Sequence, residues 1–151
     1  MNKLLNNLFD DNIEEGVVFR LQRCSGKTTF VKYKAKELLK TGNRVVVIVH
    51  NTSMKEMYKD LQHKNFSIIS YYEFLNIEIS KTAFVFYDEP WLSGITIVQQ
   101  PRRCFIGTDN TNTYTVLTKL NVDESMNEMI GEKRFREEFE CNVYKRKSET
   151  L

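Results

Sequence analysis

VVFRLQRCSGKTT, residues 17–29, is the stretch of this sequence that decides the fold. Its apolar, β-branched beginning at 17–21 predicts a short strand. The turn Ser25-Gly26-Lys27-Thr28 then leads into a helix that we predict over 28–39, and the apolar run at 44–49 predicts a second strand that is buried on both faces. A strand, a loop, a helix and a further buried strand are typical of a βαβ unit with parallel strands.

Strands and helices continue to alternate beyond this unit. The alternation predicts an α/β fold, with a mostly parallel five-stranded sheet and helices on both of its faces. The further predicted elements are a helix from a capping box at Ser53-x-x-Glu56 to about Gln62, strands at 66–69, 83–87 and 104–107, and a short helix at a second capping box, Ser70-x-x-Glu73.

The chain has 151 residues, which corresponds to about one domain. Near the end of the chain, apolar residues recur among acidic ones at roughly helical spacing over 123–139, which predicts a closing helix. The expected parts of the single domain are an amphipathic N-terminal helix within 1–15, a core over 16–120, a C-terminal helix within 121–140 and a basic tail over 141–151.

The composition excludes several classes of protein. With 41% hydrophobic and 28% charged residues, the chain has neither the composition of a disordered polymer nor that of a membrane protein. Cys24, Cys104 and Cys141 are widely spaced and form no CxxC pair, so neither a disulfide framework nor a zinc site is indicated. No apolar run approaches the ~20 residues of a membrane span. We therefore expect a cytoplasmic protein, in the host cytoplasm if the source is a phage or virus, as the Lys-, Asn- and Ile-rich character favours.

The loop between the first predicted strand and helix has the residues of a phosphate-binding loop. Backbone N–H groups and the positive end of the helix dipole bind phosphate oxygens, and Gly26 lets the backbone approach them closely. Lys27 is expected to reach the β- and γ-phosphates, and the Thr28 hydroxyl to bind Mg²⁺. The full pattern G-x4-G-K-[ST] needs a first glycine where Leu21 stands. The expected nucleotide-binding residues are Cys24, Ser25, Gly26, Lys27, Thr28 and Thr29.

A pair of carboxylates ends the predicted strand at 83–87. Asp88 and Glu89 follow an apolar run, at the position where a buried parallel strand delivers side chains to the carboxyl edge of the sheet. We expect Asp88 to hold Mg²⁺ through its water shell, and Glu89 to polarise the water that attacks the γ-phosphate. The sequence therefore predicts an ATP and Mg²⁺ site at this edge.

Together these motifs resemble the P-loop NTPases of the RecA-like, catalytic-glutamate division, which includes helicases and the large subunits of viral DNA-packaging terminases. Arg23-x-x-Gly26-Lys27-Thr28-Thr29 resembles the terminase form of the Walker A motif, and Asp88-Glu89 resembles Walker B with its catalytic glutamate. The segment 66–75 is similar to the one before the DEAD-type box of helicases, and it implies an additional strand between the two Walker strands.

The resemblance also implies roles for individual residues. Glu89, Lys27 and Arg23 are the implied catalytic residues, with Lys27 and Arg23 stabilising the charge of the transferring phosphate. A polar sensor of the γ-phosphate follows the next strand in these families, and the candidates here are Thr108, Asp109 and Asn110.

The resemblance implies partners as well. A helicase or a terminase carries a further domain that 151 residues cannot contain, so an arginine finger would come from a neighbouring subunit or a partner. DNA or RNA is the implied substrate. Between residues 20 and 64 the sequence has eleven Lys and Arg against three acids, which fits a nucleic-acid track or, equally, a solvated helix face.

Two other functions are compatible with the same motifs. Thymidine-kinase-like nucleoside kinases also join Ser-Gly-Lys-Thr-Thr to a strand that ends in Asp-Glu, although their cysteine-held zinc is not visible in this sequence. The missing first glycine is compatible with a non-hydrolysing module that binds a nucleotide or a protein partner.

Three further features receive structural interpretations. Arg102-Arg103 precedes the last predicted strand and should lie at the opposite edge of the sheet, in a structural or partner-facing role. Pro90 and Trp91 are expected to wedge the short crossover after the acids, and His50 to be a polar strand terminus.

Overall fold

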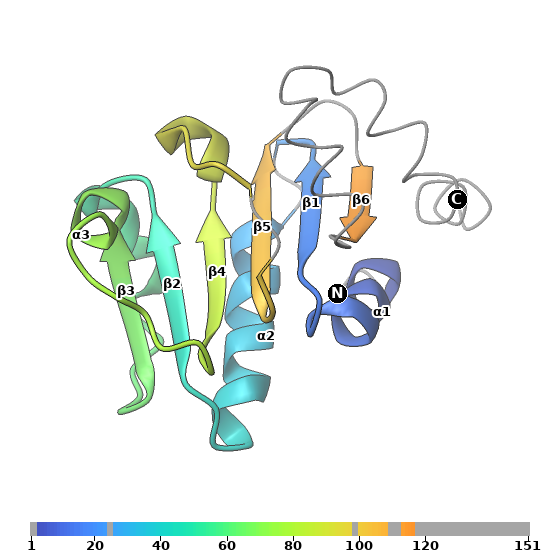
Figure 1. The fold of residues 1–151 in the computed structure, drawn as a ribbon, viewed down its shortest axis with the longest axis horizontal. Helices are drawn as coiled ribbons and strands as arrows, with labels where there is room; N and C mark the ends of the chain where they lie inside the picture. The colour runs from blue at the N-terminus through green and yellow to red at the C-terminus, as the bar shows by residue number, and fades with distance from the viewer. Residues whose placement is uncertain (1–2, 24–25, 98–99, 109–112, 117–151) are drawn as a thin grey trace.

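The fold is a single mixed sheet with its helices packed mainly on one side (Figure 1). The computed structural model describes residues 3–23, 26–97, 100–108 and 113–116. The strands are β1 (Val17–Leu21), β2 (Val45–Val49), β3 (Phe66–Ser70), β4 (Phe84–Asp88), β5 (Arg103–Thr108) and β6 (Thr113–Val116). The helices are α1 (Lys3–Asn12), α2 (Lys27–Lys40) and α3 (Tyr71–Phe74), with 3-10 helices η1 (Thr52–Tyr58) and η2 (Pro90–Ser93).

The strand order is β3-β2-β4-β5-β1-β6. Strands β1 to β5 pair in parallel, which confirms the predicted α/β fold with its mostly parallel sheet. The prediction missed β6, which pairs antiparallel with β1 and makes the sheet six-stranded. An additional strand does lie between β1 and β4, but it is β5; the segment 66–75 contributes β3, which forms the edge of the sheet.

One face of the sheet carries the larger part of the core. Side chains at alternate positions of the strands, such as Phe19, Val47 and Phe86, pack there against α1, α2 and η1. Phe9 of α1 stacks on Phe86 with ring centroids 5.5 Å apart, and Phe30 of α2 meets Phe9 edge to face at 5.8 Å. Full burial of each such side chain contributes roughly 1.5–3 kcal/mol, so this cluster fixes α2 against the sheet.

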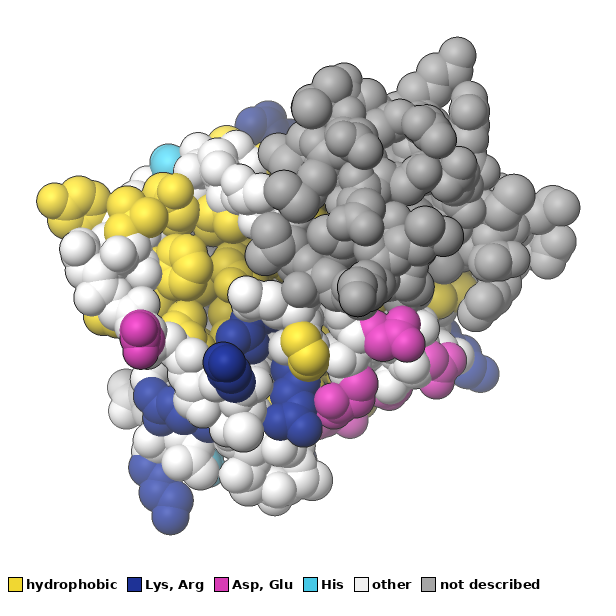
Figure 2. Space-filling model, viewed as in Figure 1, with side chains coloured by type: hydrophobic (Ala, Val, Ile, Leu, Met, Phe, Trp, Pro, Cys, Tyr) yellow, Lys and Arg dark blue, Asp and Glu magenta, His cyan; other side chains and the backbone are white. Residues whose placement is uncertain are grey.

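The opposite face carries a smaller core and only short helices. Val46, Val85, Tyr87 and Phe105 point to this face, and among the described residues only α3 and η2 add helical turns over it. Helices therefore lie on both faces as predicted, although those over this face are short in the described part of the chain. Figure 2 views this face and shows hydrophobic side chains gathered at its surface over α3 and the strands beside it.

Local helix signals were right in one case and wrong in another. Ser70 caps α3 as predicted: it accepts a hydrogen bond from the N–H of Glu73, whose side chain accepts one from the N–H of Ser70. The capping box predicted at Ser53-x-x-Glu56 does not form, because Asn51 occupies the N-cap position and accepts from the N–H of Met54. The resulting helix is the 3-10 helix η1, and it ends at Tyr58 rather than near Gln62.

The predicted C-terminal helix over 123–139 and the basic tail over 141–151 lie outside the described residues. In the part of the chain that the structure does describe, no helix has the length and apolar character needed to cross a membrane.

Candidate functional site

The candidate site lies where three adjacent parallel strands end. In the sheet register Leu21 of β1 stands opposite Thr108 of β5, and Asp88 of β4 stands opposite Ile106. The ends of β1, β5 and β4 are therefore neighbours, and α2 begins shortly after β1. The carboxyl edge of a parallel sheet, beside the start of a helix, is the usual place for phosphate groups in α/β proteins.

Gly26 sets the start of α2. Its backbone is left-handed, with φ of 81°, a conformation that glycine adopts without the penalty of a Cβ atom. Gly26 is the N-cap, and no side chain caps the helix at this end. The first N–H groups of α2 therefore keep hydrogen-bonding capacity for an anion.

Lys27 brings a positive charge into the middle of the site. Its side chain is buried, with 9% of the residue's surface exposed. The Nζ atom donates to the carbonyl oxygen of Gln22 at 3.2 Å and lies 3.8 Å from Oε1 of Glu89. The ammonium thus lies between the loop that follows β1 and the acid that follows β4, where it can contact a bound phosphate.

Asp88 is a buried carboxylate with neutral donors around it. Oδ2 accepts a hydrogen bond from the Tyr58 hydroxyl at 2.5 Å and a longer one from the Thr28 hydroxyl at 3.4 Å. Burial is the largest influence on the pKa of Asp88 and raises it above its usual value of 3.8, and the negative charge of Glu89 raises it further. The hydrogen bond from Tyr58, the charge of Lys27 and the bond from Thr28 lower this pKa, but less than burial raises it. The negative charge of deprotonated Asp88 is therefore only partly balanced by its neighbours in the folded protein.

A divalent cation fits this arrangement. Mg²⁺ is usually held by one or two carboxylates together with substrate phosphates and waters, and does not need a cage of protein ligands. The described residues contain no group of three His, Cys, Asp or Glu side chains suited to a metal. Asp88 and the Thr28 hydroxyl are the groups that would hold Mg²⁺, and its charge would compensate the buried carboxylate.

Glu89 is fixed by both its backbone and its side chain. Its backbone is left-handed, with φ of 55°, and its N–H donates to the carbonyl oxygen of Ile106 at 2.8 Å. The Thr108 hydroxyl donates to Oε1 at 2.5 Å, and the Thr108 N–H donates to Oε2 at 3.0 Å. A non-glycine residue in this backbone region costs roughly 1–3 kcal/mol, and such strain is common at functional sites.

The structure brings together five of the predicted site residues. Lys27, Thr28, Asp88, Glu89 and Thr108 are linked by the contacts given above.

The remaining predicted residues are not part of this group. Arg23 and Thr29 are exposed and bond to none of these five residues in the described structure. Cys24, Ser25, Asp109 and Asn110 lie outside the described residues.

Sequence reasoning missed Tyr58. The ring belongs to η1, is almost fully buried, and places its hydroxyl on Asp88. Burial, together with the charge of Asp88, holds the pKa of Tyr58 well above 10, so the hydroxyl remains a donor. Nothing in the residues around position 58 marks this role, because it depends on how η1 folds back over the end of β4.

Trp91 packs against β5. A Cβ atom at Gly107 would stand 2.2 Å from Cε3 of Trp91, so this ring requires a glycine on β5. The guanidinium of Arg20 lies 5.1 Å from the centre of the Trp91 ring. His50 joins the end of β2 to η2 through a hydrogen bond to Ser93 at 2.8 Å.

Several cations of the basic segment pair with acids. Lys34 is buried and contacts Asp10 at 2.7 Å and Glu37 at 2.9 Å, while Lys32 contacts Asp60 at 2.8 Å. These pairs reduce the charge that the segment could offer to a nucleic acid. Arg102 pairs with Glu14 at 3.2 Å at the amino edge of the sheet.

Comparisons with protein-family models, with curated proteins and with solved structures gave no match. The functional argument therefore depends on the chemistry of these residues and on the strand order.

Proposed function

We propose that this chain is a Mg²⁺-dependent ATP-binding and hydrolysing domain of the RecA-like P-loop type. The observation that carries the proposal is the convergence of Lys27, Thr28, Asp88, Glu89 and Thr108 where β1, β5 and β4 end. The position of β5 between β1 and β4 supports the same class, because the resemblance implies an additional strand there.

The roles follow from chemistry and burial. Lys27 and the first N–H groups of α2 bind the phosphates and stabilise their charge. Thr28 and Asp88 hold Mg²⁺, which when bound neutralises part of the charge on the β- and γ-phosphate oxygens.

Glu89 acts on the water molecule. It orients a water toward the γ-phosphorus and accepts its proton as the oxygen–phosphorus bond forms and the bond to the β-phosphate oxygen breaks. The products are ADP and inorganic phosphate, and no other reactant is needed.

Thr108 is a positioning residue in this scheme. Its two hydrogen bonds hold the Glu89 carboxylate beside Lys27, at the carboxyl edge of the sheet.

We propose that nucleic acid is the polymer on which the domain acts. A neighbouring subunit or partner would supply the arginine finger.

The test is the release of phosphate from Mg-ATP, alone and with single- and double-stranded DNA and RNA. Glu89→Gln should bind the nucleotide but lose turnover, and Lys27→Ala should lose both. Glu15→Gln is the matched control, because Glu15 is exposed near the N-terminus of β1, away from the site. Turnover by Glu89→Gln at the unmodified rate would contradict the proposal.

The same assay separates the alternatives. Nucleotide binding without turnover under every condition would favour a non-hydrolysing module. Phosphate transfer to a nucleoside, without stimulation by nucleic acid, would favour a nucleoside kinase.

A further inference from the structure

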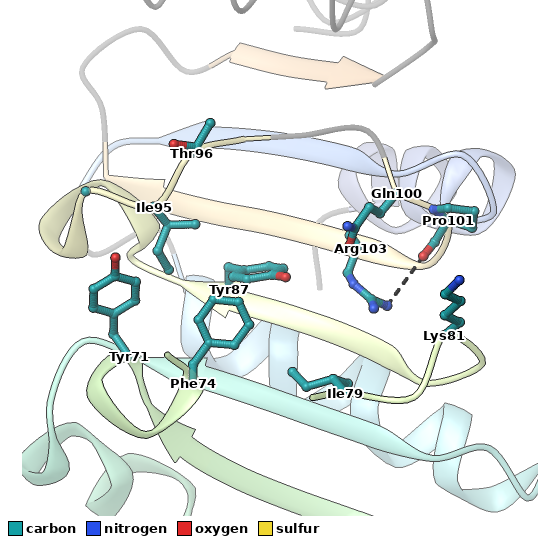
Figure 3. Close-up of a pocket in the computed structure, with 11 residues that line it drawn as sticks. Tyr71, Phe74, Ile79, Lys81, Tyr87, Ile95, Thr96, Gln100, Pro101 and Arg103 are labelled. Carbon is teal, nitrogen blue, oxygen red and sulfur yellow. Dashed lines mark hydrogen bonds between the residues drawn. The ribbon is translucent and has the colours of Figure 1, made fainter. Parts of the chain in front are cut away.

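A second site of a different kind lies on the face of the sheet opposite α2. A cavity of about 720 Å³ opens there above β4, between α3 on one side and the segment around Ile95 on the other (Figure 3). We call it the aromatic cavity. Volumes of roughly 300–1,000 Å³ are typical of sites for small organic ligands.

The walls of the aromatic cavity are apolar and flat. Tyr87 lies on its floor and stacks on Phe105, with ring centroids 4.3 Å apart and planes at 9°. Phe74 meets Tyr87 edge to face at 5.9 Å, and Ile79 and Ile95 also line the space (Figure 3). Rings held by such contacts form a rigid surface on which a planar apolar group can stack.

One end of the aromatic cavity is positively charged. Lys81 and Arg103 both lie at this end (Figure 3), and Arg103 is 94% buried because only 6% of its surface is exposed. Nη1 of Arg103 donates to the carbonyl oxygens of Ala83 at 2.9 Å and Pro101 at 3.4 Å, and its Nε has no hydrogen-bond partner.

Among the residues that the structure describes, Arg103 has no counter-charge. Within the described residues no carboxylate pairs with Arg103 or lines the cavity. Buried charges in proteins are normally paired, because an isolated buried charge is costly. An anion bound at this end of the cavity would be attracted by Arg103 and Lys81. It would also offset the free-energy cost of burying the charge of Arg103.

We propose that the aromatic cavity binds a small molecule with a flat apolar body and one anionic group. The body stacks among Tyr87, Phe74 and Ile95, and the anion, a carboxylate, sulfonate or phosphate, lies beside Arg103 and Lys81. The inference does not depend on the proposed ATPase activity, because the residues of the two sites occupy opposite faces of the sheet.

The probe is a matched pair of dyes. 8-Anilino-1-naphthalenesulfonate carries a sulfonate on an anilinonaphthalene body, and N-phenyl-1-naphthylamine has the same body without the charge. Titration of the full chain, followed by fluorescence, should give one saturable site for the sulfonate. Because a hydrogen bond to a charged group is strong, we expect the uncharged dye to bind about tenfold more weakly.

Variants then place the dye in the aromatic cavity. Lys81→Met should weaken binding of the sulfonate about two- to fivefold and leave the uncharged dye unchanged, because an exposed pair contributes little. Phe74→Ala should weaken both dyes about tenfold by removing an aromatic wall. Lys40→Met and Tyr72→Ala are the matched controls: both residues are exposed, and neither lines the cavity.

Two results would overturn the proposal. These are equal affinity for the two dyes and an unchanged affinity in both Lys81→Met and Phe74→Ala. Thermal unfolding midpoints of all variants, measured alongside, separate loss of the site from loss of the fold. Absence of ATP turnover would leave the inference intact, so the two proposals can fail separately.

Discussion

Thr108 donates two hydrogen bonds to Glu89, one from its hydroxyl to Oε1 at 2.5 Å and one from its N–H to Oε2 at 3.0 Å. The last residue of β5 therefore determines the orientation of the carboxylate that follows β4. Since β5 lies beside β4, this pair joins the ends of two neighbouring strands, and it does so close to Lys27 of α2. The relationship leads directly to a kinetic prediction.

Thr108→Val should lower kcat for ATP hydrolysis while KM changes little. The variant keeps the N–H bond and loses the hydroxyl bond, and a hydrogen bond to a charged group contributes about 1.5–3 kcal/mol, or about 10- to 100-fold in rate. Steady-state phosphate release measures the effect. Thr108→Ser should restore most of the rate, and Thr52→Val, at an exposed position, should have none of the effect. Equal rates for Thr108→Val and the unmodified chain would exclude the positioning role.

Tyr58→Phe should destabilise the protein at neutral pH. The change removes the donor at 2.5 Å from the buried Asp88 and leaves that carboxylate with the longer bond from Thr28. We expect the free energy of unfolding to fall by about 1.5–3 kcal/mol, measured by urea denaturation followed by circular dichroism. Tyr72→Phe, on an exposed ring, is the control and should leave stability unchanged.

Asp88→Asn should stabilise the protein relative to the unmodified chain, and the difference should grow with pH. Burial raises the pKa of Asp88, so the folded state holds its proton more tightly than the unfolded state. Stability is therefore lost as the pH rises from the usual value of 3.8 through the raised value in the folded protein. Unfolding midpoints measured from pH 3 upward should diverge in this window; parallel curves would show that the charge of Asp88 is balanced by its neighbours.

Mg²⁺ should restore part of the stability that is lost when the buried Asp88 carboxylate ionises. A cation that binds only the folded protein raises its stability according to the ligand concentration and the dissociation constant. Thermal unfolding in millimolar Mg²⁺, with Mg-ATP as a second condition, should therefore raise the midpoint of the unmodified chain more than that of Asp88→Asn. An equal rise in both proteins would place the cation elsewhere.

Gly107→Ala should move Trp91. The new methyl group would stand 2.2 Å from the ring, so the ring must shift, and with it the contact to Arg20. Forced overpacking of this kind typically costs about 1–3 kcal/mol. The chain contains one tryptophan, so its emission spectrum reports on this ring alone, and a red shift with a lower unfolding midpoint is expected. An unchanged spectrum would contradict the tight packing.

Much of this fold could be predicted because its signals are local. The apolar run at 44–49 and the acids after the run at 83–87 identify buried strands and their carboxyl ends. The Ser70–Glu73 capping box needs only four residues, and it forms as predicted. These features depend on neighbours in sequence, so pattern and propensity suffice to place them.

The features that were missed depend on contacts between distant segments. Asn51 replaced Ser53 as the cap of η1, where three adjacent polar residues could each begin a helix. The strand β6 is four residues long and is stabilised by pairing with β1, which lies almost a hundred positions earlier in the chain. Tyr58 reaches Asp88 across 30 positions of sequence.

The sequence predicted the main chemical groups of the candidate site but not all of the residues that contact them. Lys27, Thr28, Asp88 and Glu89 were identified from residue type and position after a strand, and they converge. The contact of Thr108, one of three candidate sensors, with Glu89 could not be predicted, because it depends on where the Glu89 side chain points. In the described part of the chain only α3 and η2 add helical turns over the face of the sheet opposite α2, and this could not be foreseen either, since the length of a connection does not reveal what packs over the sheet.

Strand β4 contributes residues to the sites on both faces of the sheet. Tyr87 points into the aromatic cavity and Asp88 toward Thr28 and Tyr58, so two consecutive residues take part in two separate sites. Inserting or deleting a single residue within 84–88 would exchange the two directions, placing a carboxylate among aromatic rings and a phenol beside Lys27. The length of β4 is therefore a requirement of both sites.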